Sequence, residues 1–255
     1  MNEDLKERER EFHDALYSQT SWEEGPRKST LKYYTAVRNN RQHFRDLVAQ
    51  YGNGKSILEI GCGDGGYMFD YPRIAAQVSG IDISDVAVAS ARKKASEQGF
   101  ANMDFQVMDV EAMSYPTGSL DVIYGAGILH HLNIDKSGKE IARVLKPSGV
   151  AIFTEPLGHN PLINLYRKLT PNMRSPDEHP FVMNDFRILD RYFGKTDASF
   201  YNLFSMAAVP FRSFSFFPQV LNILERVDES VFRIIPYLRR HAWTTIFMLS
   251  DPRRA

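Results

Sequence analysis

A glycine-rich segment that follows an apolar strand is the part of the chain whose residue types most clearly indicate chemistry. It reads ILEIGCGDGGY over residues 57–67, so a strand with Glu59 near its end passes into glycines at positions 61, 63, 65 and 66. Glycine lets a backbone approach a ligand closely and adopt φ values that other residues avoid. We therefore expect a ligand to cross the end of a strand at this loop.

The loop alone leaves two ligand classes open. Gly61, Gly63 and Gly66 satisfy the G-x-G-x-x-G fingerprint of dinucleotide-binding folds, so the segment also suits NAD. Asp82 ends the apolar run QVSGIDI about 20 residues further on, where a carboxylate binds ribose hydroxyls in either case. Neither feature separates the two classes.

Two further carboxylates favour a different ligand from a dinucleotide. Glu59 stands two residues before the first glycine, where a dinucleotide-binding strand normally stays apolar, and Asp109 closes the third apolar run in FQVMDVEAM. A carboxylate there can accept a hydrogen bond from the exocyclic amine of adenine, while Met108 and Val110 offer apolar contacts to the ring. Carboxylates at three successive strand ends suit a cationic, hydroxyl-rich, amine-bearing ligand better than a pyrophosphate.

The elements that position these residues alternate between strands and helices. Short apolar runs (SILEI, QVSGIDI, MDFQVMDV, SLDVIYGAG and GVAIFTE) predict five strands within residues 56–155. The segments between them predict crossover helices over 66–75, 84–98 and 136–146. Apolar strands joined by such helices form a parallel sheet covered on both faces, which is an α/β fold.

The flanking segments complete a three-part organisation. Helices expected over residues 4–18 and 30–50 form an N-terminal helical cap, residues 1–54. Residues 55–156 form the ligand-binding core, and residues 157–255 form an insert that shapes an acceptor site, together with the last strands of the same domain. The insert is rich first in Pro, His and Asn and then in aromatic residues.

The successive motifs resemble those of class I S-adenosylmethionine-dependent methyltransferases, of the type that acts on small molecules. The resemblance covers about residues 55–156 and rests on ILEIGCGDGGY, VSGIDIS, QVMDVEAM, LDVIYGAGILHHL and EIARVLKPSGVAIFTEP in this order. It implies a Rossmann-like, seven-stranded, mostly parallel sheet with helices on both faces and an antiparallel last strand inserted beside the sixth. Residues 241–252 fit the last strand, and residues 195–204 are the candidate for the sixth.

The resemblance also implies S-adenosyl-L-methionine as the cofactor. Glu59 and the first three glycines would line its methionine part, Asp82 would hold the ribose, and Ile83 would pack on adenine. Asp109 would accept from the adenine amine, and Gly125 would border the sulfonium. The predicted cofactor-binding residues are Glu59, Gly61, Cys62, Gly63, Gly65, Asp82, Ile83, Met108, Asp109, Val110 and Gly125.

Three residues are candidates for catalysis. His130 and His131 follow the fourth strand, and imidazole titrates near pH ~6.5, so either suits a general base. Glu155 ends the fifth strand, where open α/β sheets place ligand groups. Loop packing and cofactor positioning remain the alternative roles for the histidines. Metal binding by this adjacent pair is not expected, because neighbouring helical residues face different ways.

The flanking segments offer residues for the acceptor. The many aromatics between residues 181 and 217 predict a small, apolar or aromatic acceptor, methylated on O, N or C. His159, Asn160, Asp177, Glu178 and His179 are polar candidates there, with capping and turn formation as the alternative. In the cap, Tyr17, Trp22, Tyr33 and Tyr34 are expected either to close over the cleft or to attach the cap to the sheet or to a second subunit.

Composition narrows the partners. Lys plus Arg equals Asp plus Glu, at 31 each, so no net field favours nucleic acid or a membrane surface. The single cysteine, Cys62, forms no internal disulfide, which with the charged N-terminus favours the cytoplasm. We expect a small-molecule acceptor and possible homo-oligomers through the N-terminal helices. The rival functions are an NAD-dependent oxidoreductase and a catalytically silent cofactor-binding protein.

Overall fold

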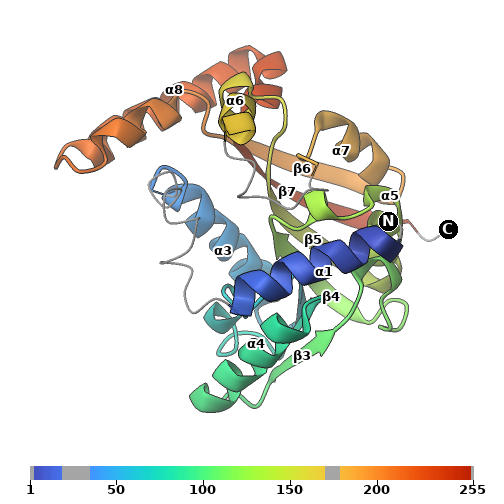
Figure 1. The fold of residues 1–255 in the computed structure, drawn as a ribbon. Helices are drawn as coiled ribbons and strands as arrows, with labels where there is room; N and C mark the ends of the chain where they lie inside the picture. Colours follow the sequence, from blue (N-terminus) through green and yellow to red (C-terminus); the bar gives the residue numbers. More distant parts are fainter. Residues whose placement is uncertain (1–2, 19–34, 170–178, 254–255) are drawn as a thin grey trace.

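A seven-stranded sheet forms the centre of the molecule in the computed structural model, which describes residues 3–18, 35–169 and 179–253 (Figure 1). Its strands lie in the order β3-β2-β1-β4-β5-β7-β6. The strands β1 to β5 pair in parallel, and β7 is antiparallel to both β5 and β6. Their bounds are β1 Ser56–Ile60, β2 Gln77–Asp82, β3 Met103–Val107, β4 Leu120–Ala126, β5 Leu145–Pro156, β6 Phe193–Tyr201 and β7 Thr244–Pro252. This confirms the predicted Rossmann-like sheet, including the inserted antiparallel last strand.

Seven α-helices accompany the sheet within the described residues. They are α1 Glu3–Ser18, α3 Arg38–Gly52, α4 Asp85–Gln98, α5 Ile134–Val144, α6 Pro161–Leu169, α7 Met183–Leu189 and α8 Phe217–Ile234. Local capping sets the bounds of α4, since the Ser84 side chain accepts from the Ala87 N–H and Gly99 ends the helix at φ 70°. Short 3₁₀ helices cover Met68–Asp70 (η2), Val110–Ala112 (η3), Leu129–His131 (η4), Ser205–Phe211 (η6) and Pro236–His241 (η7).

Both faces of the sheet carry a buried apolar layer. On one face α3 and α4 pack through Phe44 and Val88 among others, against strand residues such as Val78. On the other face α5 and α7 pack through residues such as Ile141 and Leu189. Because successive strand residues point to opposite faces, strands buried on both sides need the near-continuous apolar runs seen in the sequence.

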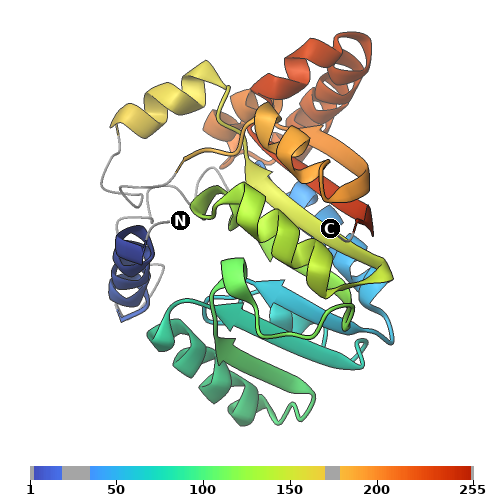
Figure 2. The same ribbon diagram turned by 90° about the vertical axis from the view of Figure 1, so that its right-hand side faces the viewer.

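The first helix does not cover a face of the sheet. Figure 2 shows α1 at the edge where the parallel strands end, apart from α5 on the face toward the viewer. In open α/β sheets this edge is where ligands bind, near the point at which the strand order reverses. Here that point is between β1 and β4, and β1 lies between β2 and β4.

Two helix predictions differ from the structure. Residues 66–75 form no α-helix, because turns and the three-residue η2 occupy them and Pro72 cannot continue a helix. The helix predicted over 30–50 begins at Arg38 instead, and residues 30–34 of that prediction lie outside the described residues. Within the part of the chain that the structure describes, no helix is both long and apolar enough to cross a bilayer.

Candidate functional site

The glycine loop after β1 takes a conformation that side chains would oppose. Gly61, Gly63 and Gly65 have φ of 65°, 51° and 89°, in the left-handed region that favours glycine. A Cβ on Gly61 would lie 2.5 Å from the Cδ1 atom of Ile128, and one on Gly65 would lie 2.7 Å from the Phe69 ring. The sequence therefore needs glycine at these positions to bring the backbone of the loop this close to its neighbours.

Gly66 differs from the other glycines of the segment. It has no positive φ, and no atom lies within 4 Å of the position that its Cβ would take. In the dinucleotide fingerprint the third glycine allows a helix to pack closely on the strand. No α-helix follows here, so Gly66 has no such packing role.

Asp82 connects the end of β2 to the glycine loop. Its Oδ2 accepts from the Gly63 N–H at 2.8 Å, and its Oδ1 accepts from the Ser84 N–H at 2.9 Å. A carboxylate has about four acceptor positions, so these two bonds leave capacity for ligand hydroxyls. Ile83, the next residue, is half-buried.

Glu59 is a buried carboxylic acid whose Oε2 has no hydrogen-bond partner in the described structure. Burial raises the pKa of Glu59 well above its ordinary range, and the nearby charge of Asp82 acts in the same direction. The buried Tyr124 hydroxyl is close to Glu59 but also makes no well-formed hydrogen bond. A buried acid of this kind is costly unless something donates to it, so a ligand cation would fit beside it.

The residues after β3 form the third part of the edge. Asp109 accepts from the Glu111 N–H at 2.8 Å and caps η3, and its other oxygen forms an ion pair with Lys6 of α1. Lys6 also lies 3.0 Å from Glu111. Val110 is buried and Met108 is half-buried against the same core. The oxygen predicted to accept from adenine is thus engaged by a helix that sequence reasoning placed only in a cap.

Cys62 lies in the glycine loop after β1, and Gly125 lies near the end of the neighbouring strand β4. Burial raises the pKa of the Cys62 thiol well above its ordinary value, which makes it a poor nucleophile. A Cβ on Gly125 would lie 2.7 Å from Ile128, so the end of β4 passes closely beneath that side chain. These placements agree with packing roles for both residues.

His130 and Glu155 form a buried pair at the ends of β4 and β5. The Nδ1 atom of His130 lies 2.6 Å from Oε2 of Glu155. The other oxygen of Glu155 accepts from the N–H groups of Ile128 and Leu129, at 2.9 and 2.8 Å. Glu155 therefore holds the loop after β4 and orients the imidazole, and its oxygens are engaged in doing so.

His131 faces a different set of residues. Its Nδ1 lies 3.3 Å from Oε2 of Glu9, and its ring contacts that of His13 at a centroid distance of 5.6 Å. Both partners belong to α1. The two adjacent histidines thus separate, with His130 toward the carboxylate of β5 and His131 toward the N-terminal helix, as expected for neighbours that do not share a face.

Further contacts attach α1 to the site edge. The Tyr17 hydroxyl lies against Gly63, where it would clash with any Cβ, and the Ser84 hydroxyl donates to Asp14. Tyr17 was expected from the sequence either to close over the cleft or to attach the cap to the sheet or to a second subunit, whereas Lys6, Glu9, His13 and Asp14 were not among the predicted site residues. Periodicity places them on a helix, and only the three-dimensional packing shows which surface that helix covers.

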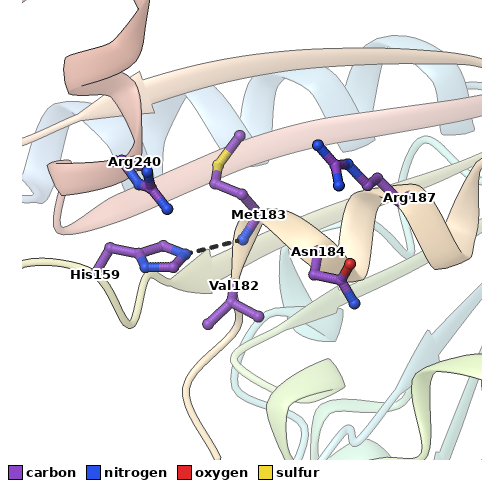
Figure 3. Close-up of a pocket in the computed structure, with 6 residues that line it drawn as sticks. All are labelled: His159, Val182, Met183, Asn184, Arg187 and Arg240. Atoms are coloured by element: carbon purple, nitrogen blue, oxygen red, sulfur yellow. Dashed lines mark hydrogen bonds between the residues drawn. The ribbon is translucent and has the colours of Figure 1, made fainter.

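A pocket of about 240 Å³ opens in the insert after β5 (Figure 3). Its lining residues are His159, Val182, Met183, Asn184, Arg187 and Arg240. The Met183 N–H donates to Nε2 of His159 at 3.3 Å. Burial lowers the pKa of His159, and the Arg240 guanidinium adds to this effect. The two arginines give the pocket cationic side chains.

The other polar and aromatic candidates have mixed placements. Asn160 is buried and bonded to the His241 carbonyl, and exposed His179 donates its N–H to the His130 carbonyl. Asp177, Glu178, Trp22, Tyr33 and Tyr34 lie outside the described residues. Among the aromatics, Phe181, Phe186 and Phe193 are core, whereas Phe204, Phe211, Phe214 and Phe216 are exposed.

Comparison with known proteins finds matches to the segment that contains this edge. Residues 58–153 match the family described as a methyltransferase domain. The aklanonic acid methyltransferase of Streptomyces sp. (strain C5) is 35% identical over 115 residues, which are 43% of this chain and 52% of that relative. The match thus spans about half the length of that curated relative.

Two solved structures share the fold at low identity. Phosphoethanolamine N-methyltransferase 2 of Haemonchus contortus, in complex with S-adenosyl-L-methionine, has a TM-score of 0.63 at 17% sequence identity. The match covers 94% of this chain and 60% of the chain of that enzyme. The [4+2]-cyclase SpnF has a TM-score of 0.56 at 21% identity and covers 84% of this chain and 83% of its own.

Proposed function

We propose that this chain is a class I S-adenosylmethionine-dependent methyltransferase that transfers the methyl group of S-adenosylmethionine to a small organic acceptor, because residues 58–153 match a methyltransferase domain. The observation that carries the proposal is the buried carboxyl of Glu59, whose Oε2 has no hydrogen-bond partner among the described residues, beside the loop that Asp82 holds. A buried acid and a glycine cradle together fit a ligand with both an ammonium group and hydroxyls.

Each part of the edge has a place in this proposal. Glu59 and the backbone of the glycine loop bind the methionine part, and Asp82 accepts from the ribose. Ile83, Met108 and Val110 contact adenine. Asp109 accepts from the adenine amine once Lys6 shares or leaves its oxygen. The cofactor supplies an electrophilic methyl group when bound.

The rival dinucleotide function is disfavoured by the third glycine. A Cβ on Gly66 would meet open space among the described residues, and no α-helix follows it closely. The sequence therefore matches the fingerprint, but the close packing of helix on strand that explains the third glycine is not present here. The catalytically silent alternative is supported by a different observation. SpnF is named as a cyclase and shares this fold, so the fold alone does not establish methyl transfer.

We assign His130 as the general base and Glu155 as the residue that positions it. With its Nδ1 bound to Glu155, the imidazole presents Nε2 for proton transfer. For a hydroxyl acceptor, Nε2 of His130 would accept the hydroxyl proton while the acceptor oxygen takes the methyl group, which the bound cofactor would supply as it is converted to S-adenosylhomocysteine.

The acceptor is proposed to be apolar or aromatic, with O, N or C as the methylated atom. The aromatic residues between 181 and 217 support this choice, and the similar aklanonic acid methyltransferase supports the broader choice of a small-molecule acceptor. Arg187 and Arg240 line the pocket in the insert, so acceptors with and without a carboxylate belong in any test. We also propose that the chain is divided into a cap, a core and an insert. We propose further that it forms homo-oligomers through the N-terminal helices, and light scattering would test this oligomeric state.

Two measurements test the proposal. Calorimetric titration should show binding of S-adenosylhomocysteine and none of NADH, and the reverse result would overturn it. Labelled S-adenosylmethionine is then incubated with a panel of phenols, quinols and amines, each with and without a carboxylate. Binding of the cofactor with no labelled product, even at high enzyme concentration, would favour the silent alternative.

A further inference from the structure

Three metal-ligating side chains come together where α1 meets the loop after β4. Glu9 and His13 are four residues apart and so share one face of α1, and His131 comes from η4. One ligand atom from each lies within 4.8 Å of the other two. We propose that Glu9, His13 and His131 bind a divalent transition-metal ion, with Zn²⁺ as the occupant, independently of the proposed methyl transfer.

The distances suit a tetrahedral ion. Oε2 of Glu9 is 3.3 Å from Nδ1 of His131 and 3.6 Å from Nε2 of His13. Zinc binds imidazole nitrogen and carboxylate oxygen at about 2.0–2.2 Å in tetrahedral geometry, which separates neighbouring ligand atoms by about 3.3–3.6 Å. Two of the three separations thus match those of a zinc site, and the third, between the two imidazoles, lies within 4.8 Å.

The chemistry of the donors selects the class of ion. Two imidazoles with one carboxylate suit Zn²⁺ and related transition metals, whereas Mg²⁺ and Ca²⁺ prefer oxygen ligands. Glu9 is buried, with 4% of its surface exposed, so its carboxylate gains from a cation held close to it. The histidines are half-buried, which leaves the site accessible to an ion from solvent.

Other side chains pack around the two imidazoles of the proposed site. His131 lies within ion-pair distance of Glu9, and the rings of His130, 4.2 Å away, and His13 contact its ring. Tyr17 stacks on the other ring, that of His13.

Such an ion would have two effects. It would join α1 to the loop after β4, and so fix the helix that lies over Gly63 and Asp109. Three protein ligands also leave the fourth tetrahedral position open, as in zinc sites that bind water or substrate. The ion would therefore lie beside the cofactor edge with one exchangeable position.

The test uses the full chain after removal of metals with a chelator. Zn²⁺ should bind with one equivalent by calorimetry, and Co²⁺ should give visible absorption typical of tetrahedral coordination. His13→Ala and His131→Ala should each weaken Zn²⁺ binding at least tenfold, and Glu9→Gln should do the same. Glu11→Gln, on an exposed position of the same helix, and His43→Ala, exposed on α3, should bind as the wild type does.

Several outcomes would overturn the assignment. Less than one equivalent of Zn²⁺, preference for Mg²⁺, or unchanged affinity in His131→Ala would each do so. If His131→Ala fails to fold by circular dichroism, His13→Ala decides, because its side chain comes from the N-terminal helix. Titration with S-adenosylhomocysteine in parallel keeps the two proposals apart, since either ligand can bind when the other does not.

Discussion

Asp82 at the end of β2 accepts a 2.8 Å hydrogen bond from the backbone N–H of Gly63, so one carboxylate fixes the loop that follows β1. Its other oxygen is bonded to the Ser84 N–H at the start of α4. The same side chain therefore links two strands and a helix at the edge where the ligand is proposed to bind. Loop geometry and cofactor affinity should depend on it together.

Asp82→Asn should weaken binding of S-adenosylhomocysteine by about 10- to 100-fold, the loss expected when hydrogen bonds to a charged group worth ~1.5–3 kcal/mol are removed. The matched control is Asp85→Asn, an exposed acid in the first turn of α4. Calorimetric titration of both variants makes the comparison. Equal affinities in the two would remove Asp82 from the site.

Gly63→Ala should disturb the loop for two separable reasons. Alanine at φ 51° costs about 1–2 kcal/mol, and its Cβ would clash with the Tyr17 hydroxyl. Adding Tyr17→Ala relieves the clash but not the backbone strain. In urea denaturation, the double variant should therefore lose less free energy of unfolding than the sum of the losses in Gly63→Ala and Tyr17→Ala. Strict additivity would mean that α1 does not rest on the loop in solution.

Glu59→Gln should stabilise the protein when no ligand is bound. Because the pKa of Glu59 is raised in the folded protein, the folded state is more stable when this carboxyl is protonated than when it is ionised. That contribution is complete below its unfolded pKa of about 4.5, and it is lost as the pH rises through the folded value. The neutral amide does not ionise, so its advantage in urea midpoint should grow from pH 5 to pH 8.

The same Glu59→Gln variant should bind S-adenosylhomocysteine more weakly, because an amide is a poorer acceptor for an ammonium than a carboxylate. Glu97→Gln, exposed on α4, is the control for both measurements. A variant that gained stability and kept full affinity would place Glu59 in the core and outside the ligand site.

Glu155→Gln tests the positioning role. The variant loses the carboxylate charge that contacts the N–H groups of Ile128 and Leu129 and the imidazole of His130, so the folded state should be destabilised by about 1–3 kcal/mol. On a methylated acceptor, kcat should fall while the KM for S-adenosylmethionine changes little. His130→Ala should lose activity with O–H acceptors and recover part of it when imidazole is added. Absence of any rescue, with a folded variant, would argue for a packing role of His130.

Much of the fold could be predicted because its signals are local. Apolar runs that close with Glu59, Asp82, Asp109 and Glu155 mark strand ends, and each of these residues lies within two residues of the end of a strand. The helix expected over 66–75 failed for a local reason too, since the chain there turns around η2 to reach β2.

The arrangement of α1 could not be predicted from the sequence. Its pattern of charged residues indicated only an exposed helix, whereas Lys6, Asp14 and Tyr17 contact residues far away in the chain. Contacts of this kind depend on tertiary packing, which periodicity does not encode. The role of Glu155 was missed for the same reason, because its hydrogen-bond donors come from the loop after β4.

The position of β7 between β5 and β6 imposes an order on folding. During synthesis β6 emerges before β7, yet it pairs with no strand other than β7 among those described. β6 therefore cannot join the sheet before β7, which itself pairs with β5 at the edge of the five parallel strands. Any nascent chain paused before residue 244 would expose the edge of β5, including the segment around Glu155, to aggregation or to chaperones.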